Sequence, residues 1–403
     1  MTKRKIINDP VFGFIAIPNE LIFQILQHPY FQRLQRIKQL GLSAVVYPGA
    51  QHTRLLHSLG AMFLTKEAIK QLRQKGNDIT ADEADGLLAA ILMHDLGHGP
   101  FSHVLESTLT QGISHEEISL RLMQKMNAEM GGRLDLAIRI FTDNYHKHFL
   151  HQLISSQLDM DRMDYLQRDC FFTGVAEGRI GSARIIKMLN VHDDKLVVEA
   201  NGIYSIENFL IARRFMYWQV YLHKTSVAAE KMLIQILRRA KELAAQGHQL
   251  EATPALRFFI ENRIDQSRFD DTALQNFVKL DDSDIISAIK VWADASDTVL
   301  STLATAFINR HLFKTTIGQP LTDEERNALL KEYAQRFGVS LHEARYFFEE
   351  QTVTTRTYDN RDAQILILYP DGTVRDIADV SDIIDQQFLE KHVKKNYICR
   401  LPL

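Results

Sequence analysis

The densest chemistry in the chain lies in HDLGHGPFSH, residues 94–103, where ten positions hold three histidines and an aspartate. Two glycines and a proline in the same stretch are poor helix formers, so helix stability does not explain its composition. By itself the stretch fits either a histidine-rich surface turn or an active site at a helix end. His94 and Asp95 could supply half of a site for a first-row divalent metal ion, because imidazole and carboxylate groups both bind such ions.

A complete metal site needs further ligands, and His57 and Asp161 are the candidates. His57 lies in HTRLLHSLG, on a helix expected to run towards Lys75, and Asp161 lies in LDMDRMDYLQRD, on another helical segment. The order along the chain is therefore His57, then His94 and Asp95, then Asp161. A lone histidine on a helix is more often structural than a ligand, so the ordered set carries the argument.

The elements that must position these residues are predicted to be mostly helices. Apolar residues recur at helical spacing in FQRLQRIKQLG, which stops at Gly41, and over a long stretch from Ile206 to Ala245. Capping boxes begin the helical segments TADEADGLLAAILMHD and SHEEISLRLMQKM. The first of these helices ends at the histidine-rich stretch and leaves its side chains free to converge.

Strand signals are few. An Asn-Gly pair at 201–202 in KLVVEANGIYSI and an Asp-Gly pair at 371–372 in QILILYPDGTVRDI each predict a hairpin turn. The predicted fold class is mainly α, with small β-hairpins. Residues 1–250 are expected to form a compact helical core and residues 251–403 a helical and β C-terminal region, with no linker to mark the boundary.

The composition is that of an ordinary globular protein, with 45% hydrophobic residues, 24% charged residues and a net charge of −3. The apolar run LLAAILM is too short to span a bilayer, and MTKRKIINDP is not followed by the apolar core of a signal peptide. Two cysteines are too few for a disulfide framework or a thiolate zinc site, so we expect a cytoplasmic protein. Residues 1–75 carry 11 Lys and Arg against 3 Asp and Glu, which fits a phosphate-bearing ligand and a solvated basic face about equally.

The order H…HD…D in helical segments resembles the HD-domain phosphohydrolase superfamily. INDPVFGFI, FQRLQRIKQLG, YPGAQHTRLLHSLG, HDLGHGPFSH and LDMDRMDYLQRD look like its deoxynucleoside triphosphate triphosphohydrolase branch (dNTPases and dGTPases), over about residues 5–225. The resemblance implies a helical HD-domain bundle that holds one divalent metal ion. Its implied ligands are His57, His94, Asp95 and Asp161. Manganese, iron, magnesium and zinc all remain open, and additional magnesium could accompany a triphosphate.

The resemblance also implies roles for other residues. His98, His103 and His115 look like catalytic histidines, which suit proton transfer because histidine titrates near neutrality. Glu106 stands where relatives carry an acidic residue that orients the partner of His115. His115 also falls at the first position of a well-capped helix, so without the resemblance a structural role explains the residue better than a catalytic one.

Further positions match the ligand contacts of the family. The matches to triphosphate contacts are Arg54, Arg162 and Arg213; those to sugar and base contacts are Gln39, Leu40, Tyr165, Asp169 and Tyr221; and those to a regulatory nucleotide site are Lys5, Asn8 and Gln32. Tyr217 stands where the vertebrate enzyme has histidine, which leaves the role of that position open. A stripe such as Tyr165 and Asp169 on one helix is otherwise usually packing.

The implied activity is hydrolysis of a dNTP to deoxynucleoside and inorganic triphosphate, by attack of water at the α-phosphorus. One alternative keeps the metal centre and changes the substrate to a nucleoside monophosphate, a cyclic nucleotide or a guanosine alarmone. Another is a catalytically silent nucleotide-binding or nucleic-acid-binding regulator. The expected partners are the dNTP, an activating nucleotide at a subunit interface of a homodimer or homotetramer, and secondarily single-stranded nucleic acid, but no membrane.

Overall fold

The structure, a computed structural model, describes residues 5–355, 364–384 and 393–402. Buried apolar side chains from early and late parts of the chain join in one hydrophobic core. None of the helices in these ranges is long and apolar enough to cross a membrane.

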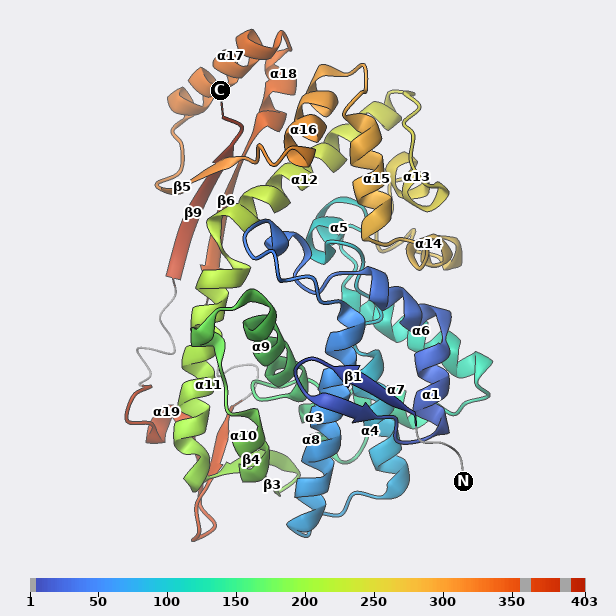
Figure 1. Ribbon diagram of the computed structural model, residues 1–403, viewed down its shortest axis with the longest axis vertical. Coiled ribbons are helices and arrows are strands. Elements are labelled where there is room, and N and C mark those ends of the chain that lie inside the picture. Colours follow the sequence, from blue (N-terminus) through green and yellow to red (C-terminus); the bar gives the residue numbers. More distant parts are fainter. Residues whose placement is uncertain (1–4, 356–363, 385–392, 403) are drawn as a thin grey trace.

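The N-terminal half is a helical bundle centred on three helices, α3 (Arg54–Gln74), α4 (Ala81–Met93) and α9 (Met160–Thr173). α3 lies between the other two and packs against both (Figure 1). The elements around them are β1 (Ile6–Asp9), β2 (Gly13–Ala16), α1 (Glu20–Gln27), α2 (Pro29–Gln32), η1 (Arg33–Arg36), η2 (Gly41–Val45), α5 (Ser102–Thr108), α6 (His115–Glu129), α7 (Asp135–Phe141) and α8 (His148–Gln152).

The chain continues through two long helices. In Figure 1, α11 (Ile203–Met216) follows one edge of the molecule, and α12 (Lys224–Ala245) crosses obliquely away from that edge. The other elements of this half are η3 (Ala176–Gly178), α10 (Ser182–Met188), β3 (Leu189–His192), β4 (Lys195–Glu199), η4 (Ala200–Gly202), η5 (Tyr217–Tyr221), α13 (Pro254–Glu261), α14 (Asp271–Phe277), α15 (Asp282–Trp292), α16 (Thr298–Ile308), β5 (Lys314–Gly318), α17 (Asp323–Phe337), α18 (Leu341–Ala344), η6 (Arg345–Phe347), β6 (Phe348–Thr355), β7 (Leu366–Leu368), β8 (Val374–Asp376), α19 (Ile377–Val380) and β9 (Val393–Arg400). The predicted fold class, mainly α with small β elements, is confirmed.

Three small sheets complete the described fold, in the strand orders β1-β2, β3-β4-β7-β8 and β5-β9-β6. Strand β4 pairs in parallel with β7, and α12 packs against α16, so contacts are extensive across the predicted boundary at residue 250. The C-terminal region is therefore built directly onto the helical core.

Helix caps fix where the chemistry-bearing residues leave their helices. Thr80 and Glu83 form the predicted capping box at the start of α4, and His94 follows its last turn. Ser114 caps α6, so His115 is the first residue of that helix. Asp159 caps α9 and places Asp161 in its first turn.

Glycines allow two close crossings at the site. A Cβ at Gly60 of α3 would lie 1.9 Å from Asp164 Oδ1 on α9, and one at Gly97 would lie 1.9 Å from the carbonyl oxygen of His115. No larger residue fits at either point without displacing its neighbours.

The prediction of a continuous helix over FQRLQRIKQLG is wrong. Helix α2 ends after about one turn and continues as the 3-10 turn η1. Phe31, Leu34 and Ile37 are all buried at a spacing of three, which is the repeat of a 3-10 helix. Lys38 then forms an isolated antiparallel bridge with Thr53, which brings this segment beside the start of α3.

The long helical pattern over residues 206–245 forms two helices, not one. Helix α11 passes into the π-helical turn η5, and the chain breaks before α12, where His223 Nδ1 accepts a hydrogen bond from the Thr225 N–H. Periodicity cannot show this break, because the apolar spacing continues across it. Single π-helical turns are frequent at functional sites, and this one carries Tyr217 and Tyr221.

One of the two predicted hairpins is wrong. Strands β3 and β4 turn at Asp193 and Asp194, both in the left-handed region with φ of 48° and 56°, whereas the Asn-Gly pair at 201–202 lies in η4. Aspartate tolerates the left-handed backbone conformation, which explains why the turn forms at Asp193 and Asp194. The hairpin at 371–372 is confirmed, with β7 and β8 antiparallel on either side of Gly372.

Candidate active site

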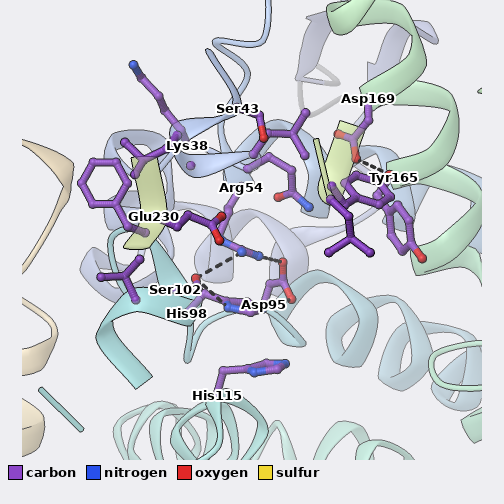
Figure 2. A pocket seen from close by; sticks show the side chains of 18 of the residues that line it. Lys38, Ser43, Arg54, Asp95, His98, Ser102, His115, Tyr165, Asp169 and Glu230 are labelled. Atoms are coloured by element: carbon purple, nitrogen blue, oxygen red, sulfur yellow. Dashed lines mark hydrogen bonds and ion pairs between the residues drawn. The ribbon is translucent and has the colours of Figure 1, made fainter. Parts of the chain in front are cut away.

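A cavity of about 790 Å³ opens among α3, the loop after α4, α9, η5 and α12, with side chains of β6 in its wall. Figure 2 shows Arg54, Asp95, His98 and Ser102 converging in it. The predicted site residues that line this cavity are Gln39, Leu40, Arg54, His94, Asp95, His98, His115, Asp161, Arg162, Tyr165, Asp169, Tyr217 and Tyr221. Among these residues Gln39 and Tyr221 are 182 positions apart in the chain (221 − 39), so the fold brings distant segments together at one place.

The four predicted metal ligands come together from three parts of the bundle. One ligand atom each of His57, His94 and Asp161 lies within 4.8 Å of the others. Asp161 Oδ1 is 3.0 Å from His57 Nε2 and 3.4 Å from His94 Nε2. Asp95 Oδ1 is 3.3 Å from His94 Nε2, and its Oδ2 is 3.7 Å from His57 Nε2.

The hydrogen bonds around the two imidazoles fit a metal ion. His57 Nε2 and His94 Nε2 are buried and have no hydrogen-bond partner among the described residues. The opposite nitrogens are engaged, since His57 Nδ1 is 2.7 Å from Asp164 Oδ2 and His94 Nδ1 is 2.6 Å from the Ile91 carbonyl oxygen. Each ring keeps its proton on Nδ1 and turns Nε2 towards the cluster. The neighbouring aspartates outweigh burial and raise the pKa of His57 to about 10 and that of His94 as well, so a bound metal ion would take the place of the Nε2 protons.

The carboxylates of the cluster are ionised. Burial acts to raise the pKa of Asp95, but the charges of the neighbouring histidines and of Arg54 hold it well below its usual range. Hydrogen bonds to the histidines likewise outweigh burial at Asp161 and lower its pKa. Two anionic and two neutral ligands are a suitable donor set for a divalent cation and do not select one metal.

A second group of titratable side chains lies beside the metal cluster. The rings of His98 and His115 stack with centroids 3.9 Å apart and an interplanar angle of 17°. His115 Nδ1 is 3.1 Å from Glu106 Oε1. Burial and the charge of Arg54 outweigh Asp95 and lower the pKa of His98 to about 3, so His98 is neutral at pH 7.

Two of the three predicted arginines reach the cavity. Arg54 donates from Nη1 to Asp95 Oδ2 at 2.7 Å, and Arg162 is held by its Nε, 2.7 Å from the Ser156 carbonyl oxygen. Arg213 is buried behind the wall, where its Nη1 donates to Gln157 Oε1 at 2.8 Å. It does not line the cavity as the match to triphosphate contacts implies.

The wall opposite the histidines is aromatic and acidic. The Tyr221 hydroxyl donates to Asp169 Oδ2 at 2.8 Å, and its ring lies edge-on to Tyr165 and to Tyr217. Burial raises the pKa of both Tyr165 and Tyr221, so their hydroxyl groups stay protonated at neutral pH. Gln39 and Leu40 join this wall.

The remaining predicted residues lie elsewhere. Lys5, whose Nζ is 3.0 Å from the centre of the Phe23 ring, lies with Asn8 at the N-terminal hairpin. Gln32 donates to the Leu26 carbonyl oxygen at the end of α2. Among the described residues none of these three lines the cavity. His103 belongs to α5, but its side chain lies outside the described part of the chain.

Three residues that support the site were not predicted. Ser102 Oγ lies 3.2 Å from Arg54 Nη2 and 2.9 Å from His98 Nδ1. Arg33 is fully buried and donates to the carbonyl oxygens of residues 96 and 98, and Asp164 holds His57. All three lie within motifs of the sequence, namely HDLGHGPFSH, FQRLQRIKQLG and LDMDRMDYLQRD, but the motifs do not show which partner each side chain holds.

Comparison with known proteins agrees with this geometry. The HD domain family matches residues 54–169, and the HD associated region matches residues 180–258. The uncharacterized protein YwfO of Bacillus subtilis is 34% identical over 322 residues, which is 78% of this chain and 72% of YwfO. The crystal structure of a phosphohydrolase from Bacteroides thetaiotaomicron VPI-5482 has a TM-score of 0.97 and 58% identity, over 99% of this chain and 100% of that one.

The chain therefore belongs to the HD-domain phosphohydrolase family and is a hydrolase. A relative with a named substrate is human deoxynucleoside triphosphate triphosphohydrolase SAMHD1, 27% identical over 282 residues. The match covers 59% of this chain and 45% of human SAMHD1, so the chain spans less than half the length of that protein.

Proposed function

We propose that this phosphohydrolase converts dNTPs to deoxynucleoside and inorganic triphosphate, with water attacking the α-phosphorus. The observation that carries the proposal is the meeting, in one cavity, of the metal-ligand cluster, the stacked histidines and the wall of Tyr165, Asp169 and Tyr221. The triphosphohydrolase name of the SAMHD1 relatives supports the substrate class.

The residues of the cavity suit hydrolysis at phosphorus. A divalent ion held by His57, His94, Asp95 and Asp161 would polarise a phosphoryl oxygen of the substrate. Arg54 and Arg162 place positive charge where phosphate oxygens must lie. Neutral His98 is held by Asp95 at Nε2 and by Ser102 at Nδ1, and in this proposal it positions the Asp95 carboxylate and the stacked His115 ring beside the reacting phosphate.

The leaving deoxynucleoside needs a proton on its 5′ oxygen. In this proposal His115 delivers that proton, because it lines the cavity and its Nδ1 lies 3.1 Å from Glu106 Oε1. The carboxylate also fixes the orientation of the ring. In this proposal Glu106 acts through His115 and does not touch the substrate.

The aromatic and acidic wall accepts the nucleoside. Asp169 offers an acceptor to a sugar hydroxyl, and Gln39 and Leu40 lie beside the sugar and base. A tyrosine packed against C2′ excludes the additional hydroxyl of a ribonucleotide by its size. The result is a preference for deoxyribonucleotides over ribonucleotides.

The test is incubation of the protein, loaded in turn with manganese, iron, magnesium or zinc, with each dNTP alone and with all four mixed. Ion-exchange chromatography should resolve deoxynucleoside and intact triphosphate, and Asp95→Ala should abolish both. Activity in the mixture alone would indicate an activating nucleotide. Release of orthophosphate or pyrophosphate in place of triphosphate, or no turnover under any condition, would overturn the proposal and favour another phosphoester or a binding role.

A further inference from the structure

A second buried histidine–aspartate pair joins the approach to α3 with α9, apart from the metal cluster. His52 Nε2 lies 2.7 Å from Asp169 Oδ1, and the Tyr221 hydroxyl donates to the other oxygen, Asp169 Oδ2. Asp169 and Tyr221 line the cavity, whereas the fully buried His52 does not line it. Each carboxylate oxygen has two lone pairs, so Asp169 can still accept a hydrogen bond from a hydroxyl group of a ligand.

The surroundings of His52 fix which nitrogen carries its proton. The ring stacks on Phe172, with centroids 4.5 Å apart and an interplanar angle of 17°. Its Nδ1 is buried and has no hydrogen-bond partner in the described chain. A buried N–H without an acceptor costs about 1–3 kcal/mol, so the proton belongs on Nε2, where it is donated to Asp169.

The backbone of His52 supports the same wall. Its carbonyl oxygen accepts the Gln39 N–H at 3.0 Å, next to the Lys38–Thr53 bridge. The loop before it lies directly against the end of α9, because a Cβ at Gly49 would be 2.7 Å from the Phe172 carbonyl oxygen. One residue thus holds both the Gln39 segment and the Asp169 carboxylate.

We infer that His52 is a positioning residue for the sugar of the nucleotide. By donating to Asp169 it keeps that carboxylate, and through it the Tyr221 hydroxyl, oriented to receive a sugar hydroxyl of the substrate. The inference rests on the proposed hydrolysis of dNTPs. It assigns to His52 a contribution to sugar recognition and none to the proton transfers at phosphorus.

The test compares two variants on two substrates. His52→Phe keeps an aromatic ring against Phe172 and removes the donor to Asp169, whereas His52→Gln keeps an amide donor near the position of Nε2. The substrates are a dNTP and its 2′,3′-dideoxy analogue, which lacks the 3′-hydroxyl. His52→Phe should raise KM for the dNTP about 10- to 100-fold, the loss expected for one hydrogen bond to a charged group. kcat should change much less.

The dideoxy analogue separates positioning from a structural role. His52→Phe should change its KM less than about 3-fold, because the hydroxyl that Asp169 would receive is absent. His52→Gln should recover most of the preference for the dNTP. Equal losses on both substrates, or a wild-type protein that does not distinguish them, would overturn the inference.

Controls distinguish its failure from that of the proposed function. His148→Phe removes an exposed histidine that also pairs with an aspartate, Asp143, and should leave both substrates unaffected. If the wild type hydrolyses no dNTP, the proposed function fails, and the same comparison is made by titration calorimetry. The inference would still be supported if the wild type binds the dNTP more tightly than the dideoxy analogue and His52→Phe loses this difference. It would be refuted if the wild type binds the two equally or binds neither. If thermal unfolding shows that His52→Phe is misfolded, His52→Gln decides: a wild-type preference for the dNTP over the dideoxy analogue supports the inference, and loss of that preference refutes it.

Discussion

Each of two ends of the cavity pairs a histidine at or just before the start of α3 with an aspartate of α9. At the metal end (His57, His94, Asp95 and Asp161), both imidazole Nε2 atoms are buried and without a hydrogen bond. At the sugar end (His52, Asp169 and Tyr221), the imidazole Nε2 is hydrogen-bonded to the aspartate, and the atom without a partner, Nδ1, faces the protein interior. The difference shows that the residue types alone do not identify a metal site. What identifies it is an imidazole nitrogen that faces the aspartates of the cluster and has no hydrogen-bond partner.

The two ends also differ in their support. Behind the metal end, Arg168 is fully buried and donates to both Asp164 and Asp9, so the outer partner of His57 is itself fixed. The sugar end depends on the segment over residues 36–39, which α15 holds through Asp281 and Asp282. The first support lies largely within the HD domain, and the second comes from outside both matched family regions.

Removing a metal ligand should have the largest effect. Asp161→Ala takes away the oxygen that lies between His57 and His94, and leaves their lone pairs facing each other across the site. We expect bound metal, measured by mass spectrometry of the purified protein, and hydrolysis to fall together to background. Asp143→Ala, which breaks the exposed pair with His148, should change neither. Full metal content in Asp161→Ala would remove Asp161 from the ligand set.

Asp164→Asn should weaken metal binding without abolishing it. The amide can still accept from His57 Nδ1, but it lacks the negative charge that makes the imidazole a better donor to a metal. Loss of such an outer partner typically costs 10- to 100-fold in metal affinity or activity, which a metal titration measures.

Asp9→Asn is the matched control for that effect. It removes the other carboxylate that pairs with Arg168 and leaves the His57 contact intact. Both variants should unfold at lower temperature, because each leaves a buried guanidinium with one anion fewer. Only Asp164→Asn should lose metal affinity; equal losses in both would mean that Asp164 acts through stability alone.

The metal end was more predictable from the sequence than the sugar end, for a physical reason. His94 and Asp95 are adjacent at a helix end, and the capping box of α4 marks that helix in the sequence. His52 and Asp169 are 117 positions apart, and their pairing depends on how a loop lies against the end of α9. Arg33 donates to backbone carbonyl oxygens, and because every residue has one, the sequence does not show which residues Arg33 binds.

The errors in the predicted elements have the same origin. Apolar spacing marks the face of a helix but not its continuity, so the break between α11 and α12 and the 3-10 geometry of η1 were not visible. That break places Tyr217 and Tyr221 in the cavity wall. The sugar end is thus formed by segments whose structure depends on tertiary packing, and local sequence patterns do not predict it.

The smallest expected effect concerns the support of the sugar end by α15. Asp282 Oδ2 accepts the Lys38 N–H at 3.0 Å, and its Oδ1 is buried without a partner in the described chain. Burial, with a smaller contribution from the charge of Asp281, raises the pKa of Asp282 to about 6, although Lys38 and Arg54 act in the opposite direction. The folded protein therefore binds this proton more tightly than the unfolded chain does.

Stability from this group is present below about pH 4 and is lost as the pH rises towards 6, because ionisation then favours the unfolded chain. Asp282→Asn cannot ionise and keeps an acceptor for Lys38, so its free energy of unfolding relative to wild type should increase by up to about 3 kcal/mol from pH 4 to pH 7. Urea unfolding at several pH values measures the difference. Asp371→Asn should show the opposite sign and only below about pH 4, because hydrogen bonds from Thr373 lower the pKa of the exposed Asp371, whose stabilisation is lost as the pH falls. Parallel curves for Asp282→Asn and wild type would mean that Asp282 is solvated, and that α15 holds the sugar end without strain.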